Sequence, residues 1–174
     1  MRIIAGALKG RRLQAPEGAE VRPTADRARE ALFSILQKYP QGPFLDLFAG
    51  SGAVGLEAHS RGYGPVVCVE RDARALACLR ANVRDAPVRI LAQDVLRLGP
   101  AAFPEQAVVF ADPPYDAAQG AWAALAPVLP GWLRPGGILV FETRAGAALV
   151  PPPGLEPVEV RRYGAAEFHL HVRK

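Results

Sequence analysis

The sequence predicts an α/β fold, a doubly wound, mostly parallel seven-stranded sheet with helices on both faces. From residue 44 to residue 142, short apolar runs alternate with amphipathic helical segments, and short links join them. The C-terminal segment differs, because residues 155–163 and 166–172 alternate in polarity around Gly164. They predict an antiparallel hairpin that closes the sheet.

Ahead of the sheet, residues 1–23 predict a small β-hairpin followed by a loop, with turn positions at Gly6 and Gly10. Residues 1–30 contain seven cationic and four anionic side chains, which is most of the chain's net charge of +4. Such a basic arm could bind a nucleic acid. A charged face that is simply solvated explains the same charges equally well. We therefore expect an arm and loop at 1–23 and a single domain, with its leading helix, at 24–174.

The elements follow from the spacing of apolar residues. A helix is predicted from Thr24, an N-cap with Asp26 in the first turn, to a point before Pro40. Five strands are predicted at 44–48, 66–70, 88–92, 108–111 and 138–142. Further helices are predicted at 53–61, 72–84 and 122–133, the last broken at Pro127 or Pro130, and a turn at 134–137.

Composition limits the class of protein. No apolar run is long enough to span a bilayer, and the N-terminus lacks the apolar core of a signal peptide. Cys68 and Cys78 have no metal-like spacing, so we expect two reduced packing residues and no metal site. The sequence thus predicts a cytoplasmic protein without a membrane partner. Its pI of about 9.4 is compatible with a polyanionic partner.

The fourth predicted strand ends in Asp112-Pro113-Pro114-Tyr115. Two consecutive prolines cannot continue a sheet ladder, and Pro114 pushes Pro113 into an extended conformation. The result is a rigid corner that carries a carboxylate, a free backbone carbonyl and an aromatic ring. Open α/β sheets bind ligands at the carboxyl ends of parallel strands, so this corner is a candidate site.

Two other strand ends carry candidate ligand-binding residues. The first strand runs into the G-x-G-x-x-G loop that starts at Gly50. By itself this loop is a weak signal, because dinucleotide-binding proteins have the same pattern. Glu70 ends the second strand and could accept hydrogen bonds from ribose hydroxyls, and Asp94 after the third could contact an adenine amino group. Together these ends predict a nucleoside site.

The segment Asp46-Leu47-Phe48-Ala49-Gly50-Ser51-Gly52 closely resembles the first motif of Rossmann-like S-adenosylmethionine methyltransferases, and residues 134–137 also resemble theirs. An acidic residue near the loop suits a sulfonium better than a pyrophosphate. The corner at 112–115 is similar to the motif of families that methylate planar exocyclic amines or amides. This resemblance implies S-adenosylmethionine as cofactor, held by Asp46, Phe48, Gly50, Ser51, Gly52, Glu70, Arg71, Asp94 and Val95. It implies a catalytic set of Asp112, Pro113 and Tyr115.

The N-terminal segments 2–6, 9–13 and 22–33 resemble the signature of the bacterial 16S rRNA guanine-N2 methyltransferases (RsmD type). The resemblance implies N2-methylation of a guanosine in small-subunit ribosomal RNA, free or as a protein-bound assembly intermediate. It implies RNA contacts from Arg2, Lys9, Arg11, Arg12 and Arg22. Thr24 and Arg27 could face the methionine carboxylate or the flipped guanosine, or could be a helix cap and a surface arginine.

Two alternatives stay open on the residues alone. The corner motif also fits methylation of adenine N6, cytosine N4 or a protein glutamine amide. A ribosome-assembly factor that binds RNA without catalysis is the second alternative, although the intact Asp112 and Gly50 argue against it. We expect the protein to act as a monomer.

Overall fold

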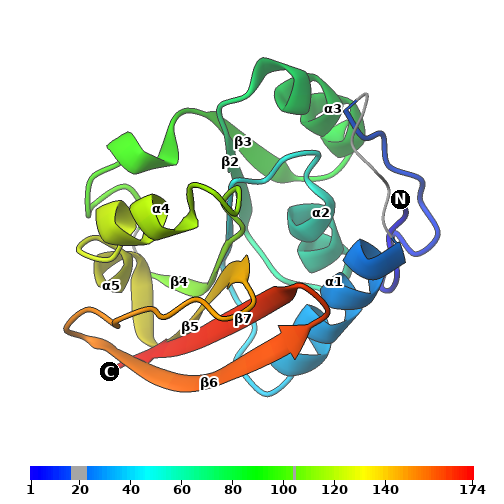
Figure 1. Ribbon diagram of the computed structural model, residues 1–174. Helices are drawn as coiled ribbons and strands as arrows, with labels where there is room; N and C mark the ends of the chain where they lie inside the picture. Colours follow the sequence, from blue (N-terminus) through cyan, green and yellow to red (C-terminus); the bar gives the residue numbers. More distant parts are fainter. Residues whose placement is uncertain (17–22, 104) are drawn as a thin grey trace.

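The computed structural model describes residues 1–16, 23–103 and 105–174, and describes the first three residues of the first helix by their backbone alone. Seven strands form one sheet in the order β3-β2-β1-β4-β5-β7-β6 (Figure 1). Their bounds are β1 Phe44–Leu47, β2 Val66–Glu70, β3 Val88–Ala92, β4 Gln106–Ala111, β5 Leu133–Arg144, β6 Leu155–Tyr163 and β7 Ala166–Arg173. Strands β1 to β5 pair in parallel, and β7 is antiparallel to both β5 and β6. The predicted fold class is confirmed.

Helices cover both faces of the sheet (Figure 1). They are α1 Pro23–Leu36, α2 Ala53–Ser60, α3 Ala73–Val83, α4 Ala118–Leu125 and α5 Leu129–Trp132, with a 3₁₀ turn, η1, at Val95–Arg97. One apolar cluster joins α1, α2 and α3 to Phe44 of β1, and the other joins α4 and α5 to Leu45. Alternate residues of the same strand thus serve two cores, as expected for a sheet buried on both sides. Among the described residues, no helix is both long and apolar enough to cross a membrane.

Three local predictions were wrong. Helix α1 begins at Pro23, so Thr24 lies inside its first turn and is not the cap. Proline suits that position because the first helical N–H has no partner within the helix. Residues 134–137 belong to β5 rather than to a turn, and the register between β4 and β5 shifts there. The helix predicted at 122–133 is two helices, of which the first starts at Ala118, with the expected break falling at Pro127.

The N-terminal arm, residues 1–16, is less regular than predicted. In this part of the described chain a single antiparallel bridge joins Arg2 to Arg12. Backbone hydrogen bonds support it, such as the one from the Ile3 amide to the Arg11 carbonyl at 3.0 Å. The arm is therefore a loose hairpin rather than a pair of regular strands.

Buried Glu57 of α2 anchors the arm. Its carboxylate accepts hydrogen bonds from the amides of Ile4 at 2.7 Å and Ala5 at 3.0 Å, and from Arg61 Nε at 2.7 Å. Arg29 Nε lies 3.6 Å from the same group. The Glu57 side chain has no exposed surface, so these donors replace all of its hydration.

Asn82 of α3 makes the second connection to the arm. Its side-chain amide accepts a hydrogen bond from the Gln14 amide at 2.8 Å and donates to the Gln14 carbonyl at 2.9 Å. The same Nδ2 donates to the Ser51 carbonyl at 2.9 Å. Asn82 thus joins the arm to the loop that follows β1.

Replacing Glu57 by alanine should lower the free energy of unfolding by about 3–5 kcal/mol, because Arg61 and two arm amides would lose their buried acceptor. Urea denaturation measures the change. Glu156→Ala is the control: Glu156 pairs with Lys174 while 57% exposed, and its loss should cost less than about 1 kcal/mol. Equal losses in the two variants would contradict the anchoring role.

Candidate active site

Two adjoining cavities lie at the carboxyl ends of the parallel strands. The larger has a volume of about 880 Å³ and the smaller about 280 Å³. Phe48, Asp112 and Glu142 line both. Phe48 follows β1 and Asp112 follows β4, and these neighbouring strands are where the strand order reverses. The cavities therefore occupy the position where open α/β sheets bind ligands.

The corner at the end of β4 faces both cavities through Asp112 and the larger one through Pro113 and Tyr115. The Tyr115 hydroxyl donates to Glu142 Oε1 at 3.3 Å, and the Arg144 guanidinium lies 5.6 Å from the centre of the Tyr115 ring. Burial and the nearby Glu142 raise the pKa of Tyr115 to about 12, so its hydroxyl stays protonated. The ring is 36% exposed, which leaves surface free for stacking.

The glycine loop after β1 forms the wall of the smaller cavity. Gly50 has a φ of +56°, and a Cβ added there would meet open space, so a ligand can approach its backbone. Gly52 has a different role, because its Cβ would lie 2.3 Å from Leu79 Cδ1 of α3. Phe48, at a φ of 61°, also has a left-handed backbone, which is strained for a side chain of this size.

Glu70 and Asp94 line the larger cavity, and each is held by backbone amides. Glu70 accepts from the Gly50 amide at 2.7 Å, and from the amides of Arg71 at 2.7 Å and Asp72 at 2.8 Å. Asp94 accepts from the Leu96 amide and pairs with Arg71 Nη1 at 2.8 Å. Burial opposes ionisation of Asp94, but these two donors outweigh it and lower its pKa. Both acids can therefore present carboxylate oxygens to hydroxyl or amino groups.

Three further acids line the cavities and hold protons unusually tightly: Asp46 is buried, Glu142 is half-buried and Asp112 is exposed. Burial, opposed in part by the Gly55 amide that donates to Asp46 at 2.8 Å, raises the pKa of Asp46 to about 8. Burial raises the pKa of Asp112 to about 6, although its side chain is open to the cavities. Burial and the neighbouring Asp112 raise the pKa of Glu142 to about 8. Within the described chain none of the three forms a salt bridge, so no cationic side chain there would compete with a bound cation for these carboxyl groups.

The structure brings most of the predicted cofactor residues together. The larger cavity is lined by Phe48, Glu70, Arg71, Asp94 and Val95. The smaller cavity is lined by Asp46, Phe48, Gly50 and Ser51. Gly52 lines neither, in keeping with its contact to α3.

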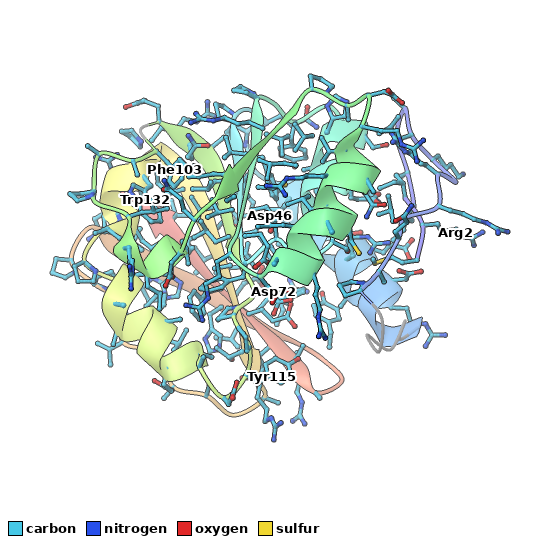
Figure 2. All side chains as sticks on the ribbon, turned by 90° about the horizontal axis from the view of Figure 1, so that it is seen from above. Arg2, Asp46, Asp72, Phe103, Tyr115 and Trp132 are labelled. Atoms are coloured by element: carbon cyan, nitrogen blue, oxygen red, sulfur yellow. The ribbon has the colours of Figure 1, made fainter. Side chains whose placement is uncertain are left out.

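The predicted RNA-binding residues lie apart from the cavities. Arg2, Lys9 and Arg12 are exposed on the arm, and Figure 2 shows Arg2 at the periphery while Asp46 lies inside. Arg11 is half-buried and donates to the Asn82 carbonyl at 2.8 Å. Arg27 is exposed on α1 and lines neither cavity. Arg22 and the side chain of Thr24 lie outside the described residues.

Sequence reasoning missed Arg29 and assigned no role to Glu142. Arg29 lines the smaller cavity while only 4% exposed, and its Nη2 donates to the Arg2 carbonyl and to Asp26. Its position three residues before Leu32 on the buried face of α1 was the available signal. For Glu142 the signal was an acid near the end of a strand neighbouring β4.

Asp46 makes a testable contribution to pH dependence. Its carboxyl group stabilises the fold fully below the ordinary pKa of 3.8, and this contribution is lost as pH rises to about 8, because the unfolded chain ionises first. Asp46→Asn keeps an acceptor for the Gly55 amide and cannot ionise. Between about pH 5 and pH 8, the free energy of unfolding should fall in the wild type because Asp46 opposes folding as it ionises. In Asp46→Asn this fall should be smaller by on the order of a few kcal/mol. Chemical denaturation measures this, with exposed Asp116→Asn as control. Equal pH slopes in the wild type and Asp46→Asn would contradict it.

Comparison with known proteins identifies the family. Residues 1–172 match the family described as conserved hypothetical protein 95. Ribosomal RNA small subunit methyltransferase D of Haemophilus influenzae is 31% identical over 179 residues, which cover 98% of this chain and 93% of that protein. The Escherichia coli K12 protein of the same name is 35% identical over 119 residues, covering 66% of this chain and 60% of its own length.

A solved structure extends the likeness to three dimensions. A hypothetical protein of Thermus thermophilus superposes with a TM-score of 0.82 at 36% identity, covering 100% of this chain and 99% of that one. Sequence match, fold and the position of the cavities agree with the resemblance that the motifs indicated. The chain therefore belongs to the conserved hypothetical protein 95 family, the RsmD-type methyltransferases.

Proposed function

We propose that this protein transfers a methyl group from S-adenosylmethionine to the exocyclic N2 amine of a guanosine in small-subunit ribosomal RNA. The observation that carries the proposal is the position of Asp112, which lines both the cavity walled by the glycine loop and the cavity walled by Glu70 and Asp94. A nucleophile held by Asp112 would thus lie beside the cofactor region.

The residues of the two cavities fit S-adenosylmethionine, which when bound supplies an electrophilic methyl group on a sulfonium. Glu70 and Asp94 offer acceptors for the ribose hydroxyls and the adenine amine, and Leu96, 42% exposed, offers an apolar surface to the ring. The open space over Gly50 admits the methionine part. Asp46 and Asp112 supply negative charge once ionised, which a cation would favour.

The substrate amine needs activation because its lone pair is delocalised into the purine ring. Hydrogen bonds from its two N–H groups to the Asp112 carboxylate and the Pro113 carbonyl would favour a pyramidal nitrogen. Tyr115 would stack on the base and hold it in place. Most of the rate enhancement would come from orientation, with electrostatic stabilisation second. Asp112 positions the amine more than it deprotonates it, since the proton becomes acidic only as the methyl group transfers.

The ribosomal substrate is supported by the relatives and by the arm. The two relatives described above are both named ribosomal RNA small subunit methyltransferase D. Arg2, Lys9 and Arg12 are exposed on the arm and available to RNA phosphates. We include a partly assembled small subunit among the substrates, because a compact domain with a small basic arm gains from proteins that present the target nucleotide.

Asp112→Ala should lower methyl transfer at least about 1,000-fold, because the amine loses its main acceptor, while S-adenosylmethionine still binds. Labelled cofactor is incubated with protein-free ribosomal RNA, partly assembled particles and whole small subunits, and the methylated nucleoside is identified. Asp116→Ala, exposed and outside both cavities, is the matched control. Retained turnover in Asp112→Ala would refute the role, and a product other than N2-methylguanosine would refute the substrate.

Reversing charge on the arm should weaken RNA binding alone. The double variant Arg2→Glu, Arg12→Glu should raise KM for the RNA substrate roughly 10-fold or more and flatten its salt dependence, with cofactor affinity unchanged. Arg89→Glu, exposed near the amino end of β3 and outside both cavities, is the control. An unchanged KM would move the RNA interface away from the arm.

A further inference from the structure

Glu142 of β5 lies in the candidate site without a role in the chemistry described above. It lines both cavities together with Asp112 and Phe48, and its side chain is half-buried. Of its contacts in the described chain, one is a side-chain hydrogen bond, from the Tyr115 hydroxyl at 3.3 Å. One oxygen, Oε2, therefore remains free to accept a further hydrogen bond.

Glu142 and Asp112 also interact with each other. The two side chains lie close enough together that the charge of Asp112 raises the pKa of Glu142. No salt bridge within the described residues offsets either charge. Two such acids, one directly after β4 and one in the adjacent β5, form a surface that only accepts hydrogen bonds once both are ionised. Their natural partner is a group with several N–H donors side by side.

The Watson–Crick edge of guanine has this pattern, because its N2 amine carries two N–H groups and the adjacent N1 carries a third. Adenine differs, since the ring nitrogen next to its amine is an acceptor. A carboxylate that faced that nitrogen would meet a lone pair. Flipped bases are commonly read along this edge, and a site built to bond a substrate N–H rejects analogues that lack it.

We propose that Glu142 is a specificity-determining residue that accepts the guanine N1–H while Asp112 holds the neighbouring N2 amine. This inference rests on the proposed function. According to this inference, the Asp112–Glu142 pair selects guanine over other bases that have an exocyclic amine. The Tyr115 hydroxyl bonds Oε1, which leaves Oε2 to read the base without it.

The test uses the base analogue 2-aminopurine, which keeps the 2-amine of guanine but has an unprotonated N1. Small subunits are assembled with guanosine or 2-aminopurine at the position that the wild-type enzyme methylates. Values of kcat/KM are measured at a pH above the raised pKa of Glu142, which is about 8, so that most of its carboxyl group is ionised. The wild type should prefer guanosine about 10- to 100-fold. Glu142→Gln should reduce this preference roughly 10-fold, because a glutamine amide can also donate to N1.

Tyr115→Phe is the matched control. It removes the hydrogen bond to Glu142 and keeps the ring, so its preference for guanosine should stay within about 3-fold of the wild type. If Tyr115→Phe lost the preference as Glu142→Gln does, Glu142 would act only by holding Tyr115, and the proposal would be overturned. Glu142→Ala should also lose the preference and serves if the glutamine variant does not fold, which thermal denaturation reports.

The outcomes separate this inference from the proposed function. A wild-type enzyme that methylates no guanosine in any particle removes the proposed function and the inference with it. A wild-type enzyme that methylates guanosine, together with Glu142 variants that keep the full preference, overturns the inference alone.

Discussion

The hydrogen bond from the Gly55 amide to buried Asp46 is the interaction on which the rest of the structure depends. It fixes the first turn of α2 against β1 and so sets the course of the glycine loop between them. Helix α2 in turn carries Glu57 and Ser60, which bind the N-terminal arm. A single buried acid thus orients both the loop of the smaller cavity and the helix that holds the arm. This dependence explains why its raised pKa is tolerated, because a protonated carboxyl group still accepts the bond.

Most of the fold could be predicted from the sequence because its signals are local. Parallel strands buried on both faces appear as short apolar runs, and β2 and β3 have the predicted bounds. The errors arose where a neighbour overrides the local signal. Residues 134–137 contain proline and two glycines, yet pairing with β4 draws them into β5. Thr24 is a good cap by composition, but Pro23 is compatible with the first turn and starts the helix one residue earlier.

The candidate site divides in the same way. Asp112, Gly50 and Glu70 follow strands in the sequence, so parallel packing alone places them at one edge. Arg29 and Glu57 could not be assigned, because their roles depend on contacts with residues 27 and 53 positions away in the chain. Gly52 was grouped with the ligand-binding glycines. The structure gives another reason for a glycine there, because Leu79 of α3 occupies the space that a side chain would fill. Motif spacing does not distinguish a glycine that faces a ligand from one that faces a helix.

Asn82 couples the position of the N-terminal arm to the position of the glycine loop. One amide group spans Gln14 of the arm and Ser51 of the glycine loop, three bonds in all. If the arm shifts, the Ser51 carbonyl must move with it or lose a buried partner, which costs free energy. A ligand that binds and orders the arm would therefore also order the glycine loop, and the reverse holds. The first ligand to bind would lower the entropy cost of binding the second.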